Sequence, residues 1–368
     1  MITKTITSHD VYNYGASLQA YSLQQFLLEN GHENEIIDYK PIYSRARYNF
    51  WYVSPRYKFS NFKLLWLPVC LFLAPKRFKT INRKKSFDTF TRQYLKLTNV
   101  RYENYKHLEK ADLKADAFIV GSDQVWNSDH INGRDPANYL AFASKDSRKI
   151  SYAASFGMDH IKLGYEKMVY ENLKTFDYIT VRESHGLQIL DDLGLKGEQV
   201  VDPTLLHNRD WWNKHCISKV NDEYLLVYDF GYSTVIRDIA QKIARSRGLK
   251  IYSINDFTTH DYADVNINDA GPIEFISLIR GAKYFVSNSF HGTIFSLIFE
   301  IPFLVVKRTQ GNVNSRMESL LKMVGINDRL VGDMSETDNL DDIDFTTVKK
   351  NIKDKALRSA NLLLSLLR

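Results

Sequence analysis

The sequence predicts an α/β fold made of two Rossmann-like domains that face each other across a cleft. Short apolar runs with the character of buried strands alternate with helical runs along most of the 368 residues. This length exceeds what one hydrophobic core usually supports. The alternation also occurs in two series separated by Asp202-Pro203, where proline restricts the backbone and marks a predicted hinge.

We therefore expect an N-terminal domain over residues 1–205, interrupted by a basic and aromatic insert at about 43–92. A C-terminal domain is expected over 206–335, followed by a helical tail over 336–368. Packing of this tail back on the N-terminal domain is one option.

The composition favours a cytoplasmic enzyme. The chain has 49 Lys and Arg against 43 Asp and Glu, a net charge of +6, without the dense basic stripe of a nucleic-acid-binding protein, so we expect no nucleic-acid partner. Cys70 and Cys216 are too few for a disulfide framework, and no Cys/His cluster has zinc spacing, so no metal is expected. The first residues also lack the features of a signal peptide.

The first βαβ unit is predicted from a strand over 2–6, a helix over 16–28 and a strand over 35–39. The loop before the helix lies at the carboxyl edge of the sheet, where ligands bind in such folds. It contributes three candidate substrate-binding residues, Asn13, Tyr14 and Gly15. The alternative for Gly15 is that it only shapes the turn.

The insert that follows interleaves aromatic and basic residues around the apolar run 64–73. This run falls short of the ~20 residues that span a bilayer. Its cationic flanks, with Trp51 and Trp66 nearby, are typical of a segment that lies at a membrane surface. Peripheral contact with the inner membrane leaflet is therefore one hypothesis, and helices that close over the domain core are the other.

Two further strands deliver polar residues to the same edge. The buried run 118–120 ends at Gly121 and is followed by Ser122, Asp123 and Gln124. Asp123 could bind a sugar hydroxyl or act as a base, or it could only form an Asx turn. The strand at 178–181 is followed by Arg182 and Glu183, and a cation at this position suits an anionic ligand.

The C-terminal domain repeats the pattern. Its strands are predicted at 224–228 and 250–254 and its helices at 234–245 and 272–282, before a last βαβ unit with a strand at 284–286, a helix at 293–299 and a strand at 303–306.

His291 lies in the loop before the helix of this last unit. The helix N-terminus offers unpaired N–H groups and partial positive charge to an anion. Gly292 allows a close approach of the backbone to a ligand. The alternative is that Ser289 and Thr293 only cap the helix and that His291 has no task.

A polar loop with Lys307 and Arg316 at its ends follows, and it is long enough to fold over a ligand. A simple surface connection is the alternative. A helix is expected directly after it, at 318–324.

Six motifs occur in the order and spacing of the polysaccharide pyruvyl transferase family, which the chain resembles up to about Val331. They are Asn13-Tyr14-Gly15 with Leu18-Gln19-Ala20, Gly121-Ser122-Asp123-Gln124-Val125-Trp126, Tyr152-Ala153-Ala154-Ser155-Phe156-Gly157, Val181-Arg182-Glu183, Asp202-Pro203-Thr204 and Ser289-Phe290-His291-Gly292.

This resemblance implies a GT-B-like arrangement and a transferase of polysaccharide or exopolysaccharide biosynthesis. Such an enzyme moves a pyruvyl group from phosphoenolpyruvate to a sugar of a surface polysaccharide or its lipid-linked precursor. The product is a cyclic ketal, phosphate is released, and no cofactor is implied beyond the donor substrate.

The family's histidine corresponds to His291, a candidate general acid or phosphate ligand, and its arginine corresponds to Arg182, expected to clamp the donor's carboxylate or phosphate. Asp123 or Glu183 is the expected base, which leaves that choice open. The candidate catalytic residues are thus His291, Arg182 and Asp123, and the candidate substrate-binding residues are Asn13, Tyr14, Gly15, Ser122, Gln124, Glu183, Ser289, Gly292, Thr293, Lys307 and Arg316.

Two rival functions remain at this point. A GT-B-like glycosyltransferase, similar to sialyltransferases, would use a nucleotide-sugar donor. The sequence shows no carboxylate pair or Gly-rich diphosphate fingerprint placed for such a donor. A non-catalytic carbohydrate-binding protein would tolerate the loss of His291 and Arg182.

Overall fold

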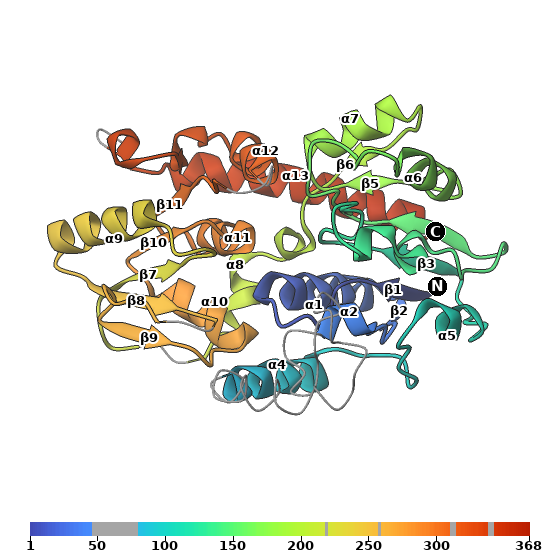
Figure 1. Cartoon of the computed structure of the whole chain (residues 1–368), viewed down its shortest axis with the longest axis horizontal. Coiled ribbons are helices and arrows are strands. Elements are labelled where there is room, and N and C mark those ends of the chain that lie inside the picture. Colours follow the sequence, from blue (N-terminus) through green and yellow to red (C-terminus); the bar gives the residue numbers. More distant parts are fainter. Residues whose placement is uncertain (46–79, 218–219, 257–258, 310–313, 338–341) are drawn as a thin grey trace, which may run out of the picture.

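The structure is a computed structural model that describes residues 1–45, 80–217, 220–256, 259–309, 314–337 and 342–368. Cys70 and the apolar run 64–73 lie outside these ranges, and so does most of the segment for which membrane contact is predicted. The described chain forms two α/β halves that lie side by side along the long axis of the molecule (Figure 1). The predicted fold class is therefore confirmed.

The N-terminal half contains a parallel four-stranded sheet in the order β2-β1-β3-β4. Its strands are β1 (Ile2–Ile6), β2 (Glu33–Ile36), β3 (Ala117–Val120) and β4 (Arg148–Ser151). All four residues of β3 are buried, as expected for a parallel strand covered on both faces. A short parallel pair, β5 (Thr180–Val181) and β6 (Glu198–Gln199), joins the edge of β4 through isolated bridges.

The C-terminal half contains a parallel six-stranded sheet in the order β12-β11-β10-β7-β8-β9. Its strands are β7 (Tyr224–Tyr228), β8 (Lys250–Ile254), β9 (Val265–Ile267), β10 (Tyr284–Ser287), β11 (Phe303–Val306) and β12 (Leu330–Val331). The predicted strands at 224–228, 250–254 and 303–306 have the observed bounds.

Helices cover the faces of the two sheets. In the N-terminal half they are α1 (Tyr14–Glu29), α2 (Ile42–Arg45), α4 (Ile81–Tyr94), α5 (Tyr105–Glu109), α6 (Glu166–Leu173) and α7 (Ser184–Asp192). In the C-terminal half they are α9 (Thr234–Arg247), α10 (Pro272–Gly281), α11 (Phe290–Phe299) and α12 (Ser315–Val324). Within the described residues, no helix combines the length and apolar character needed to cross a membrane.

The two halves share a hydrophobic core. The Tyr14 ring of α1 stacks on Phe275 of α10, with ring centroids 4.3 Å apart, and the Tyr14 hydroxyl donates to the Ala270 carbonyl at 3.0 Å. Helix α4 joins this core through Phe87 and the buried Arg83, which pairs with Asp256 at 2.8 Å. The described part of the basic insert therefore packs on the core rather than facing away from it.

Three elements connect the halves: a 3₁₀ turn (Pro203–Leu206), α8 (Arg209–Asn213) and the carboxy-terminal helix α13 (Phe345–Leu366). Helix α13 contacts α11 and α12 of the C-terminal half. Its other end, with Leu363 and Leu367, packs into the cluster formed by α1, β3 and β4, so that the C-terminus lies on the N-terminal half (Figure 1).

Three site helices begin earlier than the sequence pattern predicts. One is α12, which starts at Ser315 rather than 318, so that Arg316 lies in its first turn and not in a loop. Helix α1 starts at Tyr14 because the Asn13 side chain caps it by accepting from Ala16 N. Helix α11 starts at Phe290 because Ser289 accepts from Gly292 N. The expected loop positions of Gly15 and His291 are therefore wrong, since both residues lie in the first turns of helices.

Candidate functional site

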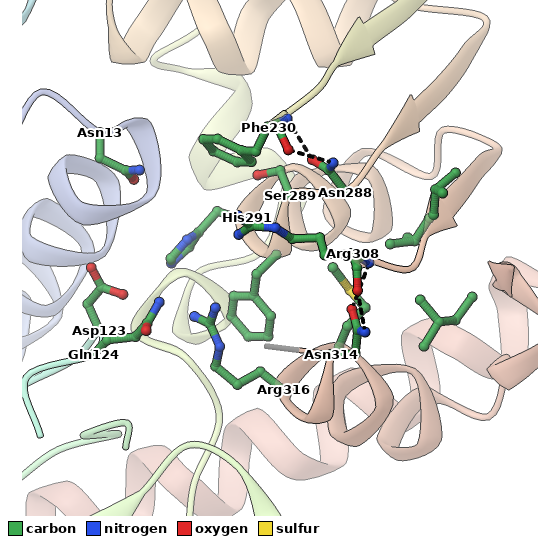
Figure 2. A pocket seen from close by; sticks show the side chains of 15 residues that line it. Asn13, Asp123, Gln124, Phe230, Asn288, Ser289, His291, Arg308, Asn314 and Arg316 are labelled. Atoms are coloured by element: carbon green, nitrogen blue, oxygen red, sulfur yellow. Dashed lines mark hydrogen bonds between the residues drawn. The ribbon is translucent and has the colours of Figure 1, made fainter. Parts of the chain in front are cut away.

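A pocket of ≈170 Å³ lies between the two halves, at the carboxyl edges of their sheets. We call it the interdomain pocket. Figure 2 shows Asn13, Asp123 and Gln124 of the N-terminal half facing His291, Arg308 and Arg316 of the C-terminal half. The rest of its lining is Phe230, Asn288, Ser289, Phe290, Val305, Val306, Asn314, Met317 and Leu330.

The N-terminus of α11 forms one wall of this pocket. Ser289 caps the helix, and Asn288 before it accepts from Phe230 N and donates to Asp229 Oδ1, both at 2.8 Å. These bonds tie the ends of β7 and β10 together and fix the direction in which α11 starts. The positive end of the helix dipole is therefore held at the pocket.

His291 joins the two halves. Its Nε2 atom lies 3.3 Å from Oδ2 of the buried Asp202, in the connection between the sheets. Its Nδ1 atom lies so close to Gly15 of α1 that a Cβ there would be 1.9 Å away. Gly15 therefore makes room for the imidazole, and no Cβ can be accommodated at this position without a shift.

Asp202 is held as a carboxylate. Burial by itself would raise the pKa of Asp202, but the adjacent His291 and Arg182 hold it well below its usual range. Its Oδ1 atom accepts from Thr204 N and Oγ1 at 3.1 and 2.7 Å. The buried Asp202 carboxylate therefore bonds to Thr204 and lies beside both His291 and Arg182.

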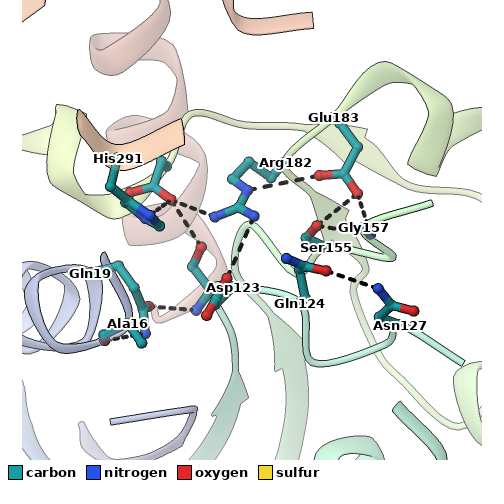
Figure 3. Close-up of polar contacts among 12 residues, drawn as sticks. Ala16, Gln19, Asp123, Gln124, Asn127, Ser155, Gly157, Arg182, Glu183 and His291 are labelled. Carbon is teal, nitrogen blue, oxygen red and sulfur yellow. Dashed lines mark hydrogen bonds and ion pairs between the residues drawn. The ribbon is translucent and has the colours of Figure 1, made fainter. Parts of the chain in front are cut away.

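Arg182 is not part of the pocket's lining. Figure 3 shows its guanidinium between Asp123, Glu183 and His291. Its guanidinium is 2.8 Å from Asp202 and 3.8 Å from both Asp123 and Glu183, and it stacks over the Phe290 ring at 4.5 Å. Burial opposes its charge, yet these three carboxylates raise the pKa of Arg182. In this geometry the Arg182 guanidinium is surrounded by three carboxylates of the protein, and its predicted contact with the donor stays a prediction.

The two candidate bases have different surroundings. The buried Glu183 carboxylate accepts from Ser155 Oγ and Phe156 N at 2.9 Å and from Gly157 N at 3.3 Å (Figure 3). The Asp123 side chain is 20% exposed and lines the pocket. Asp123 also adopts the left-handed conformation, with φ 71°, and such backbone strain concentrates at functional sites. The geometry therefore favours Asp123 as the base.

Two arginines supply positive charge to the pocket. With its amide oxygen facing Arg316, Gln124 accepts from Nη1 and Nη2 at 2.9 and 3.0 Å. Burial, together with the positive charge of Arg182, lowers the pKa of Arg316 to about 10, so Arg316 remains protonated at neutral pH. Arg308 is half-buried, and burial lowers its pKa as well.

Lys307 is exposed and does not line the pocket, whereas its neighbour Arg308 does. Both residues follow directly after the end of β11. The Asn314 side chain accepts from Arg308 N at 2.9 Å and donates to the Arg308 carbonyl at 3.0 Å, and these bonds hold the backbone of Arg308 in place.

Four other predicted residues support the pocket without lining it. Tyr14 belongs to the core between the halves, and the Ser122 hydroxyl donates to Asp202 at 3.3 Å. Gly292 packs closely on Phe285, and Thr293 Oγ1 bonds to the Ser289 carbonyl at 3.0 Å.

The prediction missed Asp202, Phe230, Asn288, Arg308 and Asn314 as site residues. The sequence does contain a sign that Asp202 belongs to the site, because this carboxylate directly follows the apolar pair Val200-Val201 and precedes Pro203. Across the described parts of the chain, no group of three or more His, Cys, Asp or Glu side chains is placed to hold a metal ion.

A sequence model of one family, polysaccharide pyruvyl transferase, matches residues 13–309. Among curated proteins, no sequence matches the chain. Similar solved structures include UDP-GlcNAc 2-epimerase from Neisseria meningitidis bound to UDP-GlcNAc, with TM-score 0.53, 10% identity and coverage of 100% of this chain and 99% of that one. UDP-GlcNAc 2-epimerase from Methanocaldococcus jannaschii gives TM-score 0.50, 13% identity and the same coverage. These are GT-B fold proteins, and the likeness shows the GT-B-like fold.

Proposed function

Because the chain belongs to the polysaccharide pyruvyl transferase family, we propose that it transfers a pyruvyl group from phosphoenolpyruvate to a saccharide as a cyclic ketal. In this reaction two sugar hydroxyls form bonds to C2 of the donor and the C2–O bond to phosphate breaks. One hydroxyl proton goes to the methylene carbon, which becomes a methyl group, and the other leaves with phosphate. The reaction needs no oxidant or reductant.

The observation that carries this proposal is the gathering of positive charge in a small pocket. Arg308, Arg316, His291 and the N-terminus of α11 meet there, and a carboxylate and a phosphate on one small donor suit this arrangement. The pocket of ≈170 Å³ is also below the roughly 300–1,000 Å³ typical of sites for drug-sized ligands. A phosphorylated three-carbon acid therefore suits it better than a nucleotide-sugar.

We assign the roles as follows. His291, which lies 3.3 Å from Asp202, binds the anionic donor and supplies the proton for the methylene carbon. Arg308 and Arg316 bind the donor's anionic groups. Asp123, on the opposite wall, accepts the proton of the attacking sugar hydroxyl.

Ligand-induced thermal shift tests the donor most directly. We expect phosphoenolpyruvate to raise the melting temperature and UDP-sugars and CMP-sugars to leave it unchanged, because a ligand of the native state stabilises by mass action. Stabilisation by a nucleotide-sugar and none by phosphoenolpyruvate would favour the glycosyltransferase instead.

Two neighbouring cations provide a matched pair of variants. Removing a charge-assisted bond costs about 1.5–3 kcal/mol, so Arg308→Ala should weaken phosphoenolpyruvate binding by about tenfold or more. Lys307→Ala removes the adjacent exposed cation and should leave the affinity within about twofold. Isothermal titration calorimetry measures both, and equal effects of the two substitutions would contradict the proposed donor site.

A further inference from the structure

A second and larger pocket opens on the N-terminal half beside the interdomain pocket. We call it the N-terminal pocket; its volume is ≈570 Å³, against ≈170 Å³ for the interdomain pocket. Asn13 and Asp123 line both. The rest of its lining comes from the segment after β1, the segment after β2 and residues 129–138.

Asp123 therefore stands at the boundary of the two pockets. A ligand in the N-terminal pocket would reach the Asp123 carboxylate from one side, while the donor would lie against it from the other. Asp123 is held in place from behind, because Arg182 Nη2 lies 3.8 Å from it and Gln19 of α1 accepts from Ser122 N at 3.0 Å. This is the placement that a base needs to take a proton from one substrate as that substrate attacks another.

Two tyrosines form a rigid part of the N-terminal pocket. The hydroxyls of Tyr39 and Tyr43 donate to the same atom, Asp135 Oδ2, at 2.6 and 2.7 Å. Asp135 is itself fixed, since its Oδ1 atom accepts from Ala137 N at 3.0 Å. Because the hydroxyls are used internally, the tyrosines offer a ligand mainly their rings, which give contact area at low entropic cost.

The charges of the N-terminal pocket differ from those of the interdomain pocket. Carboxylates of Asp10, Asp123 and Asp129 belong to its lining, and the Asp10 carboxylate is paired with the buried Lys40. Its arginine, Arg134, is already engaged, with Nη1 2.7 Å from the Tyr165 hydroxyl and the guanidinium over the Tyr165 ring at 5.0 Å. The pocket therefore offers hydrogen-bond acceptors and aromatic rings, which suit hydroxyl groups and disfavour a second anion.

We infer that the N-terminal pocket holds the acceptor, and that the sugar bound there is uncharged rather than a uronic acid or a sugar phosphate. This inference rests on the proposed function. Tyr39 and Tyr43 contact the acceptor, and Asp123 receives its hydroxyl proton. The size of the pocket leaves room for more than the sugar that receives the pyruvyl group.

Tyr43 allows a matched test of this assignment. Tyr43→Ala removes the ring, whereas Tyr43→Phe keeps the ring and removes only the hydroxyl bonded to Asp135. The assay is phosphate release from phosphoenolpyruvate with methyl glycosides of galactose, glucose, mannose and N-acetylmannosamine, and with methyl lactoside. We expect Tyr43→Ala to raise the acceptor KM about tenfold or more and Tyr43→Phe to change it by less than about threefold.

Titration of phosphoenolpyruvate in the absence of sugar separates this inference from the function on which it rests. We expect both Tyr43 variants to bind the donor like the wild type, which also shows that they are folded. If the wild type neither binds phosphoenolpyruvate nor releases phosphate with any of these sugars, the proposed function fails. If the wild type binds phosphoenolpyruvate and releases phosphate, but Tyr43→Ala leaves the acceptor KM unchanged, the assignment of the acceptor to the N-terminal pocket is wrong and the proposed function stands.

A separate comparison of two sugars tests the predicted charge of the acceptor. Methyl galacturonoside and methyl galactoside differ by one carboxylate, and saturation-transfer NMR detects the binding of either sugar without turnover. We expect weaker binding of the uronoside, by about tenfold, because its carboxylate would lie beside the carboxylates of Asp123 and Asp129. Equal or tighter binding of the uronoside would overturn the preference for an uncharged sugar.

Discussion

The Asp202 carboxylate has the most consequential single contacts in the site, because it holds His291 and Arg182 from two different parts of the chain. Removing its charge would leave the buried Arg182 guanidinium and the His291 ring without their common partner. We expect Asp202→Asn to lower the free energy of unfolding by about 3–5 kcal/mol. Urea denaturation near neutral pH measures this loss, and a change below about 1 kcal/mol would contradict the role of Asp202.

The pH dependence of stability follows from the same residue. The pKa of Asp202 is lower in the folded state than its unfolded value of about 3.9, so its contribution is fully present above that pH. The contribution is lost progressively as the pH falls further. Wild-type stability should therefore drop more steeply than that of Asp202→Asn below about pH 4, and parallel curves from denaturation at several pH values would count against this linkage.

Arg182 shows where residue-level prediction from the sequence reaches its limit. The sequence places a cation at a strand end, which suits an anionic ligand, but its carboxylate partners come from three separate segments that meet only in the folded chain. We expect Arg182→Lys to lower kcat and stability while the KM for phosphoenolpyruvate changes less than about threefold, because the planar fork orders Asp123 and Asp202. Arg316→Lys, which changes a residue of the pocket lining, should raise the KM for phosphoenolpyruvate. A raised KM in Arg182→Lys and an unchanged KM in Arg316→Lys would instead indicate that Arg182 binds the donor.

At the scale of elements, the contact between α1 and α11 sets the distance between the two halves at the site. Alanine favours a helix over glycine by about 1 kcal/mol, yet Gly15→Ala should destabilise the protein, because its Cβ would be 1.9 Å from His291 Nδ1. His291→Ala should relieve this clash. A double-mutant cycle in chemical denaturation should therefore show coupling of about 0.5–3 kcal/mol, and additive effects would exclude the direct contact.

The starts of these two helices could not be read from the apolar pattern. The pattern begins where side chains turn toward the core, whereas each helix begins at its cap, Asn13 or Ser289. The first turns are polar and carry Gly15 or Gly292, so they resemble loops. The inner strands of the C-terminal sheet were easier to predict because they are short, continuous apolar runs buried on both faces. The half-buried edge strand β9 and the two-residue β12 were not predicted.

At the scale of the whole molecule, the fold class could be predicted because the alternation of strand-like and helix-like runs can be read directly from the sequence. The distinction between Asp123 and Glu183 could not, because both follow strands and differ only in what surrounds them after folding. Likewise, Lys307 and Arg308 are adjacent cations in the sequence. Only the folded chain shows that Arg308, and not the exposed Lys307, lines the pocket.

The carboxy-terminal helix α13 makes the two halves stabilise each other, since it packs on α11 and α12 at one end and on α1 and β4 at the other. Leu363 is 1% exposed and Leu357, on the same helix, is 57% exposed. Leu363→Ala should cost about 2–5 kcal/mol of unfolding free energy, and Leu357→Ala no more than about 0.5 kcal/mol.

Because Leu363 anchors the helix to the N-terminal half, calorimetry of Leu363→Ala should also show two separated transitions where the wild type shows one. A single transition with an unchanged midpoint would mean that the shared core around Tyr14 and Phe275 holds the halves together without α13.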